Sequence, residues 1–161
     1  MEFRVGEKVI HWVYGLGEVI QLDEKVLSGK KTPCYVVQIR DLTIWVPSNG
    51  DGKKRLRRPT PADKFDRFFA ILGGPSEPLS SDRVERRTQL LEKMEDGKLE
   101  SICRIVRDLS KYSQGKKLND YEKSILQRAE EFLLMEWKYS LLVPQAQAER
   151  ELKHLLGEQA G

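Results

Sequence analysis

Three arginines are spaced so that their side chains could bind phosphate. Arg86 and Arg87 follow Arg83 at steps of three and four residues, which places all three on one face of a helix, near its N-terminal end. Guanidinium groups pair well with phosphate oxygens, and the positive end of the helix dipole adds to the attraction. Such contacts would give salt-dependent DNA binding with little sequence preference. The alternative is a solvated helix face with local ion pairs such as Asp82–Arg86.

A tryptophan in a predicted strand could anchor a protein partner. Ile44 and Val46 occupy one face of the strand expected over residues 43–47, so Trp45 points to the other face. A small sheet has one core face, and an exposed tryptophan beside a sheet edge is typical of a binding hot spot. We therefore expect Trp45 to be an outward-facing contact residue.

No arrangement of residues predicts catalysis or metal binding. His11 and His154 stand outside any acid–base or zinc motif, and Cys34 and Cys103 lack metal-ligand spacing. The Gly-x-Gly at residues 15–17 leads from one strand into another, which indicates a bend rather than a phosphate-binding loop. The sequence therefore predicts a protein that is not an enzyme and that uses no cofactor, no metal and no small-molecule substrate.

Composition and charge favour a cytoplasmic protein built of two small domains. Of the 161 residues, 39% are apolar and 33% are charged, and no apolar run approaches the roughly 18 residues of a membrane span. The N-terminus lacks a signal-peptide pattern, so we expect no membrane partner. Residues 1–60 carry 11 Lys and Arg against 7 Asp and Glu, concentrated in a turn-rich run at residues 53–58. That run indicates a linker or an anion-binding patch.

The N-terminal half has the two-residue period of β-strands. The pattern predicts five short antiparallel strands, at residues 3–5, 8–13, 18–23, 35–39 and 43–47, joined by tight turns. Five strands in fewer than fifty residues would form a strongly bent sheet or a partial barrel. We place a first domain at residues 1–59, with the basic linker at its end.

The C-terminal half has the 3.6-residue period of helices. The strongest signal covers residues 119–142, where Asn119 and Glu122 form a capping-box pattern. Four more helices are predicted: one capped by Thr60, one from residue 80 or 81 to residue 97, one over 98–112 and a weaker one over 145–156. The fold class is therefore α+β, with a second, all-α domain of about five helices at residues 60–161. Residues expected in the helical core include Val84, Leu90, Leu91, Met94 and Leu126.

The order and spacing of many residues resemble the CarD/CdnL family of bacterial transcription factors. In the N-terminal half the similarity is carried by Phe3-x-Val5-Gly6-x-x-Val9, Tyr14-Gly15-Leu16-Gly17-x-Val19, Val46-Pro47 and Leu56-Arg57. In the helical half it is carried by Arg86, Leu91-Glu92-Lys93-Met94, Gly97, Val106-Arg107-Asp108-Leu109, Leu118, Glu122-Lys123, Leu126 and Ala129. The resemblance covers essentially the whole chain. It implies a Tudor-like N-terminal domain of the kind shared with the transcription-repair coupling factor.

The resemblance also implies two partners, the RNA polymerase β subunit and promoter DNA. The N-terminal sheet would add itself to a strand in the lobe of the β subunit, a form of β-augmentation. By position, the polymerase contacts would be Lys25, Leu27, Trp45 and Pro47. The helical domain would rest on promoter DNA at the upstream edge of the melted region, through Arg83, Arg86 and Arg87, and favour the open complex.

Two positions depart from the family pattern. A gap-free alignment from Leu91 places Arg83 where family members usually carry a tryptophan that wedges into the minor groove. An arginine can enter a narrow minor groove but offers no apolar wedge. Trp45 stands where family members carry varied residues, which indicates a contact tuned to its own β subunit or a different partner.

Two other functions stay open from the sequence. The Tudor-like sheet could bind a protein other than polymerase, with the helical half as a spacer and no salt-dependent affinity for forked DNA. Alternatively, the basic run at residues 53–58 could bind RNA, which would show as a preference for RNA over duplex DNA.

Overall fold

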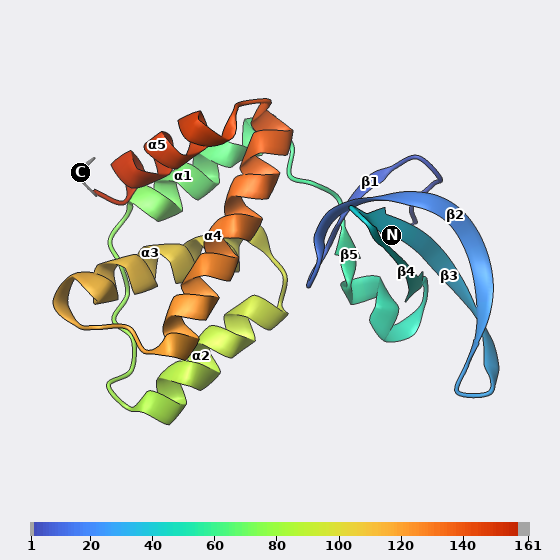
Figure 1. Ribbon diagram of the computed structural model, residues 1–161, viewed down its shortest axis with the longest axis horizontal. Helices are drawn as coiled ribbons and strands as arrows, with labels where there is room; N and C mark the ends of the chain where they lie inside the picture. Colours follow the sequence, from blue (N-terminus) through green and yellow to red (C-terminus); the bar gives the residue numbers. More distant parts are fainter. Residues whose placement is uncertain (1, 158–161) are drawn as a thin grey trace. The chain divides into compact units, whose positions relative to one another are not determined.

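The chain divides into two compact units, with the boundary between Pro59 and Thr60. The computed structural model describes residues 2–157, apart from the side chains of Asp51 and Lys53. The first unit is a β-sheet and the second is built of helices, so the α+β class is confirmed (Figure 1).

The first unit is an open sheet of five antiparallel strands. They are β1 (Lys8–His11), β2 (Gly15–Leu27), β3 (Lys30–Ile39), β4 (Leu42–Pro47) and β5 (Leu56–Arg57). Their order is β4-β3-β2-β1-β5, so β4 and β5 form the two edges and the sheet does not close into a barrel. The β2–β3 pairing continues to Leu27 and Lys30, beyond the residues that pair with β1 and β4. The two strands therefore extend as a long ribbon (Figure 1).

The expected number of strands is confirmed, but one of the five is a different segment. Residues 3–5 form no strand: Phe3 is buried in the core, and the chain turns at Gly6, whose φ is +97°. The fifth strand is β5, which pairs with β1 through Leu56 opposite His11. The predicted bend at residues 15–17 lies within β2, where a side chain at Gly17 would collide with Ile39.

One face of the sheet carries the core of the first unit. Its buried members are Phe3, Val9, Val19, Tyr35, Val37, Ile39, Val46 and Leu56. They recur at every second position along β3, as expected for a sheet with one face turned to the core.

The second unit is organised around its longest helix. The helices are α1 (Phe65–Gly73), α2 (Arg83–Glu95), α3 (Leu99–Gly115), α4 (Asp120–Leu141) and α5 (Gln145–Leu155). Short 3-10 turns cover Gly50–Lys54 and Ala62–Lys64. Helix α4 packs against α2, α3 and α5, and α1 packs against α3 and α5 (Figure 1). None of the helices in residues 2–157 is both long enough and apolar enough to cross a membrane.

Two predicted helix caps differ from the structure. Asn119 does cap α4, since its side chain accepts a hydrogen bond from the Glu122 amide at 2.8 Å. Glu122 does not complete a capping box, because its carboxylate pairs with Arg86 instead. Thr60 caps no helix: a 3-10 turn precedes α1, and the Thr60 amide donates to Glu136 Oε2 at 2.8 Å.

The predicted core is partly wrong for α2. Helix α2 begins after Asp82, whose side chain accepts from the amides of Val84 and Glu85. It buries Leu90 and Met94, whereas Val84 and Leu91 are 75% and 43% exposed. Because Arg86 lies on the same side as Leu90, a charged residue occupies the inward face that we assigned to apolar side chains. Leu126 lies only half-buried at the margin of the core.

Candidate protein-binding and DNA-binding surfaces

The register of the sheet turns Trp45 away from the core, as predicted. Trp45 lies opposite Val36 and Pro47 lies opposite Cys34, which in turn pairs with Asp23 on β2. Side chains of directly paired residues point to the same face, so these residues share the face opposite the core. The Trp45 side chain is 39% exposed.

Lys25 and Leu27 extend this surface along β2. They follow Asp23 at steps of two residues, and side chains at that spacing point to the same face. The structure therefore brings all four predicted polymerase contacts onto one surface. We call the set Asp23, Lys25, Leu27, Trp45 and Pro47 the Trp45 face.

The indole of Trp45 is contacted by two side chains of β2. The Lys25 ammonium lies 3.9 Å from the centroid of the ring, within cation–π range. The indole N–H donates to Asp23 Oδ2 at 3.4 Å, and Asp23 Oδ1 accepts from the Glu24 amide at 2.8 Å. Asp23 was not among the residues predicted from the sequence, because its role depends on a register that spans three strands.

Cys34 lies on the same face and is nearly fully buried. Burial raises the pKa of its thiol, and the Asp23 carboxylate raises it further. A thiol of this kind is a poor nucleophile at neutral pH, so the Trp45 face presents a binding surface without a reactive cysteine.

The Trp45 face adjoins an unpaired sheet edge. Strand β4 ends the strand order, and no other strand among residues 2–157 pairs with its outer side. An edge strand of this kind offers main-chain donors and acceptors to another chain. The surface therefore combines a backbone edge with an aromatic side chain.

The three predicted arginines line one small pocket, but they differ in exposure. Arg86 is only 8% exposed, and its Nη2 lies 3.1 Å from Glu122 Oε1. Its Nη1 donates to the Ser80 carbonyl at 3.1 Å, and its guanidinium lies 5.2 Å from the ring centroid of Tyr112. Arg86 therefore lies beside Arg83 and Arg87 but is not exposed as expected, because α2 turns its side chain toward Glu122 of α4.

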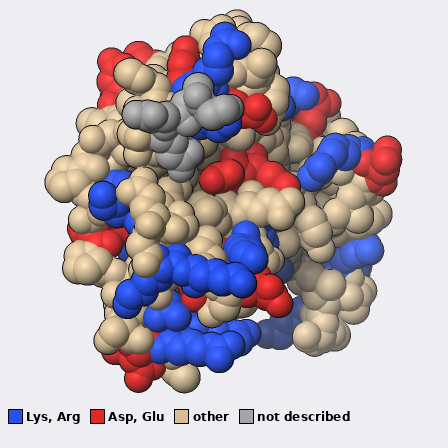
Figure 2. All heavy atoms as spheres, turned by 60° about the vertical axis from the view of Figure 1, so that its left-hand side comes forward, with Lys and Arg blue, Asp and Glu red and all other residues tan. Residues whose placement is uncertain are grey.

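Arg83 and Arg87 are exposed near the start of α2. The Arg87 guanidinium lies 4.4 Å from the ring centroid of Tyr121, and Lys116 lies 5.8 Å from that of Tyr112. Arg83 and Arg87 line one small pocket with Arg86, and Arg86 and Lys116 both lie near the ring of Tyr112. We call Arg83, Arg87 and Lys116 the basic face. Figure 2 shows Lys and Arg side chains gathered on the lower part of the face that is turned forward. Lys116 was missed because it comes from the α3–α4 loop, which has no periodic pattern.

The basic run before the domain boundary is partly structural. Arg58 Nη2 donates to the Glu2 carbonyl at 2.8 Å and lies 3.5 Å from Glu7 Oε2. Its guanidinium also lies 4.9 Å from the ring centroid of Phe3. The side chain of Lys53 lies outside the described residues. Arg58 thus ties the end of the sheet unit to its beginning.

His11 has a structural role in the sheet unit. Its Nδ1 accepts hydrogen bonds from the amides of Val13 and Tyr14 at 3.1 and 3.2 Å, and its ring stacks on Tyr14. Burial, with a further contribution from the charge of Arg55, lowers the pKa of His11 to about 4. A proton on Nδ1 would remove both bonds, so the fold requires the neutral imidazole.

We expect the stability of the sheet unit to fall when the pH drops below the normal histidine range. The pKa of His11 is 6.5 in the unfolded chain and about 4 in the folded one, so the unfolded state binds the extra proton between these values. The free energy of unfolding of the sheet unit should have fallen by about 3 kcal/mol once the pH is below 4, because each unit of pKa difference corresponds to about 1.4 kcal/mol. An NMR titration of the His11 ring checks this, and a midpoint near 6.5 would contradict it. A His11→Asn chain, with a non-titrating acceptor, is the control.

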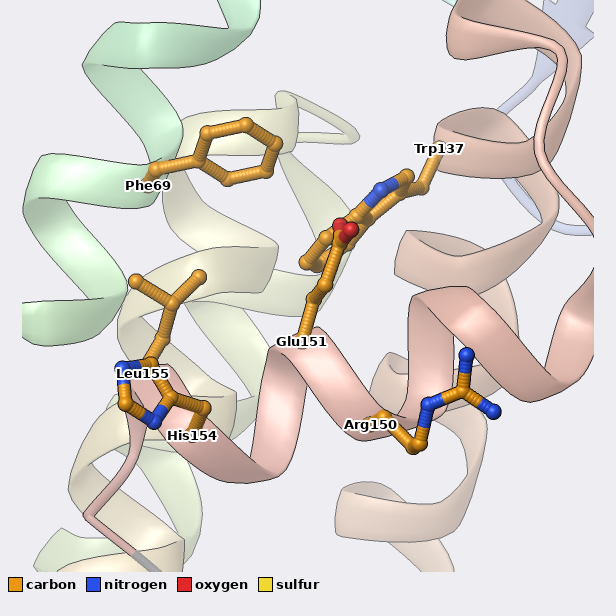
Figure 3. A pocket seen from close by; sticks show the side chains of 6 residues that line it. All are labelled: Phe69, Trp137, Arg150, Glu151, His154 and Leu155. Atoms are coloured by element: carbon orange, nitrogen blue, oxygen red, sulfur yellow. The ribbon is translucent and has the colours of Figure 1, made fainter.

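An apolar groove lies between α1, α4 and α5, with a volume of about 460 Å³ (Figure 3). It is lined by Phe69, Trp137, Arg150, Glu151, His154 and Leu155. His154 and Glu151 are exposed on α5. No group of three His, Cys, Asp or Glu residues within residues 2–157 could hold a metal ion.

Comparison with known proteins identifies both units. The model of the CarD-like/TRCF RID domain matches residues 3–59, and that of the CarD C-terminal domain matches residues 67–153. The chain belongs to the CarD family. It is also 26% identical over 140 residues to "Putative transcription factor YdeB" of Bacillus subtilis (strain 168). The aligned region covers 83% of this chain and 89% of that protein. The chain is thus a CarD-family transcription regulator, with an RNA polymerase-interacting domain and a helical C-terminal domain, in a family of non-enzymatic factors.

Proposed function

We propose that this chain binds the β subunit of RNA polymerase through its sheet and contacts promoter DNA through its helical unit. The helical unit would lie near the upstream edge of the melted region and bias the stability of the open complex. The main support is the position of the Trp45 face, beside the unpaired edge of an RNA polymerase-interacting domain.

The polymerase contact would be a strand addition to β4. Main-chain hydrogen bonds along Leu42–Pro47 would provide affinity. Trp45 and Pro47 come from that strand, and Lys25 and Leu27 come from the β2–β3 ribbon, so side chains from two strands would provide specificity. A large exposed aromatic ring near the centre of such a surface is typical of a hot spot.

The DNA contact would be made by the basic face. Arg83, Arg87 and Lys116 are exposed, whereas Arg86 is buried and would support the surface without touching DNA. The first turn of α2 adds the positive end of its dipole. Binding the opened promoter more tightly than the closed one would shift that equilibrium by about 1.4 kcal/mol per tenfold difference in affinity, without any chemistry.

Replacing Trp45 with alanine should weaken binding to the polymerase β lobe by at least about 30-fold, the loss typical of a hot-spot residue. The fold should persist, because Trp45 lies outside the core of the sheet unit. Titration of the purified lobe with the full chain, followed by calorimetry, measures the affinity. Val5→Ala, at another exposed apolar residue, is the control and should bind normally. Equal binding by the Trp45→Ala and wild-type chains would refute the polymerase contact.

Replacing Arg83 and Arg87 together with alanine should reduce both the affinity for forked DNA and its dependence on salt. Each lost phosphate contact lowers the slope of log K against log salt by about 0.7 to 0.9, so the double variant should lose between about 1.4 and 1.8. Arg150→Ala, which removes an exposed arginine of α5, is the control. An unchanged slope would exclude this face from DNA binding. Wild-type affinity that is independent of salt would instead favour a protein-interaction module without a DNA role.

A further inference from the structure

Trp45 on β4 is held from two directions by alternate residues of β2, which lies on the far side of β3 in the sheet. Lys25 Nζ lies over the indole ring at 3.9 Å, and Asp23 Oδ2 lies 3.4 Å from the indole nitrogen. Asp23 and Lys25 are themselves exposed, and both belong to the long β2–β3 ribbon.

The carboxylate of Asp23 is itself fixed in place. Its second oxygen accepts from the Glu24 amide at 2.8 Å, so rotation of the carboxylate toward solvent would break a main-chain hydrogen bond. The acceptor for the indole N–H is therefore oriented before any partner arrives. Lys25 restrains the same ring from its face, which leaves the indole little freedom to change rotamer.

An exposed tryptophan without such restraints would have to be ordered when it binds. The cost of immobilising one such side chain corresponds to about three- to tenfold in affinity. Restraining the ring beforehand removes that cost, which is the usual benefit of pre-organisation.

We propose that Asp23 and Lys25 are positioning residues that hold Trp45 in its binding orientation, with Asp23 acting through the indole N–H. The predicted effect of Asp23 and Lys25 on affinity rests on the proposed polymerase contact. Their effect on the orientation of the Trp45 indole does not. It assigns Asp23 a role in recognition although its carboxylate need not touch the partner.

The first test uses the free full chain. NMR should show the Trp45 indole proton protected from exchange, with Lys25 side-chain protons shifted by the ring current. Both signals should be lost in Asp23→Ala and only weakened in Asp23→Asn, whose single side-chain oxygen can keep one of the two bonds that Asp23 accepts. Identical spectra for wild type and Asp23→Ala would overturn the proposal. This readout does not involve polymerase, so it separates failure of the positioning role from failure of the proposed function.

The second test is a double-mutant cycle on binding to the polymerase β lobe. Asp23→Ala should weaken binding about three- to tenfold in the wild-type chain and have no effect in a Trp45→Phe chain, which lacks the indole N–H. Asp23→Asn, which has one acceptor oxygen in place of two, should bind with an affinity between those of wild type and Asp23→Ala. An equal loss of affinity in both backgrounds would show that Asp23 touches the partner directly. No loss of affinity in either background would show that the contact of Asp23 with Trp45 does not affect binding. Either result would overturn the positioning role.

Discussion

Replacing Arg86 with alanine should destabilise the helical unit by about 3–5 kcal/mol, the usual cost of removing one partner of a buried ion pair. Glu122 is 3% exposed, and its Oε1 accepts from both Nε and Nη2 of Arg86, at 3.3 and 3.1 Å. Without the guanidinium, a carboxylate would remain buried and uncompensated between α2 and α4. A domain of ordinary stability has only about 5–15 kcal/mol in total, so the variant should be close to unfolding.

Denaturant unfolding followed by helical circular dichroism measures this loss. Arg83→Ala and Arg87→Ala serve as matched controls and should each change the free energy of unfolding by less than about 1 kcal/mol, since both residues are exposed. Replacing both partners, as Arg86→Met with Glu122→Leu, should recover most of the stability because no buried charge remains. A loss below about 1 kcal/mol for Arg86→Ala would place this residue in solvent and return it to the DNA-binding surface.

Replacing Trp137 with alanine should cost about 3–5 kcal/mol, as for other large aromatic residues in a core. The side chain is fully buried on α4, and its ring centroid lies 4.8 Å from that of Phe69 on α1. The cavity left behind would adjoin the groove between α1, α4 and α5 (Figure 3). The packing of α4 against the helices beside it therefore depends on this ring.

Trp137→Phe provides the control for that experiment. It keeps an aromatic ring next to Phe69 and removes an indole N–H that finds no acceptor among the described residues. Its loss in free energy of unfolding should stay below about 1.5 kcal/mol. Equal losses for the alanine and phenylalanine variants would contradict the view that ring packing, rather than the N–H group, makes Trp137 important.

The sequence predicted the elements well, but not which face of α2 turns inward. Steps of three and four residues place Arg83, Arg86 and Arg87 near one another on a helix whichever way it faces. Only packing against α4, which supplies Glu122 from 36 positions away, decides that Arg86 is buried and that Val84 is exposed. Such a pairing leaves no local signal in the sequence.

The sheet shows the same difference between local and long-range information. Alternation around Trp45 was enough to predict that it faces outward, because the period of a strand is two. Strand β5 consists of two residues and exists only through its pairing with β1, so no pattern could predict it. The contact of Asp23 with Trp45 likewise depends on the register across β2, β3 and β4.

The most direct test of the proposed function is the fraction of open promoter complexes formed by the cognate RNA polymerase, measured by fluorescence of a probe in the melted region. We expect the full chain to increase this fraction on a promoter whose open complex is unstable. Trp45→Ala and the Arg83→Ala, Arg87→Ala double variant should each lose the effect, while Val5→Ala and Arg150→Ala keep it. An open fraction that the wild-type chain leaves unchanged, or that both binding-face variants raise as much as wild type does, would contradict the proposed function.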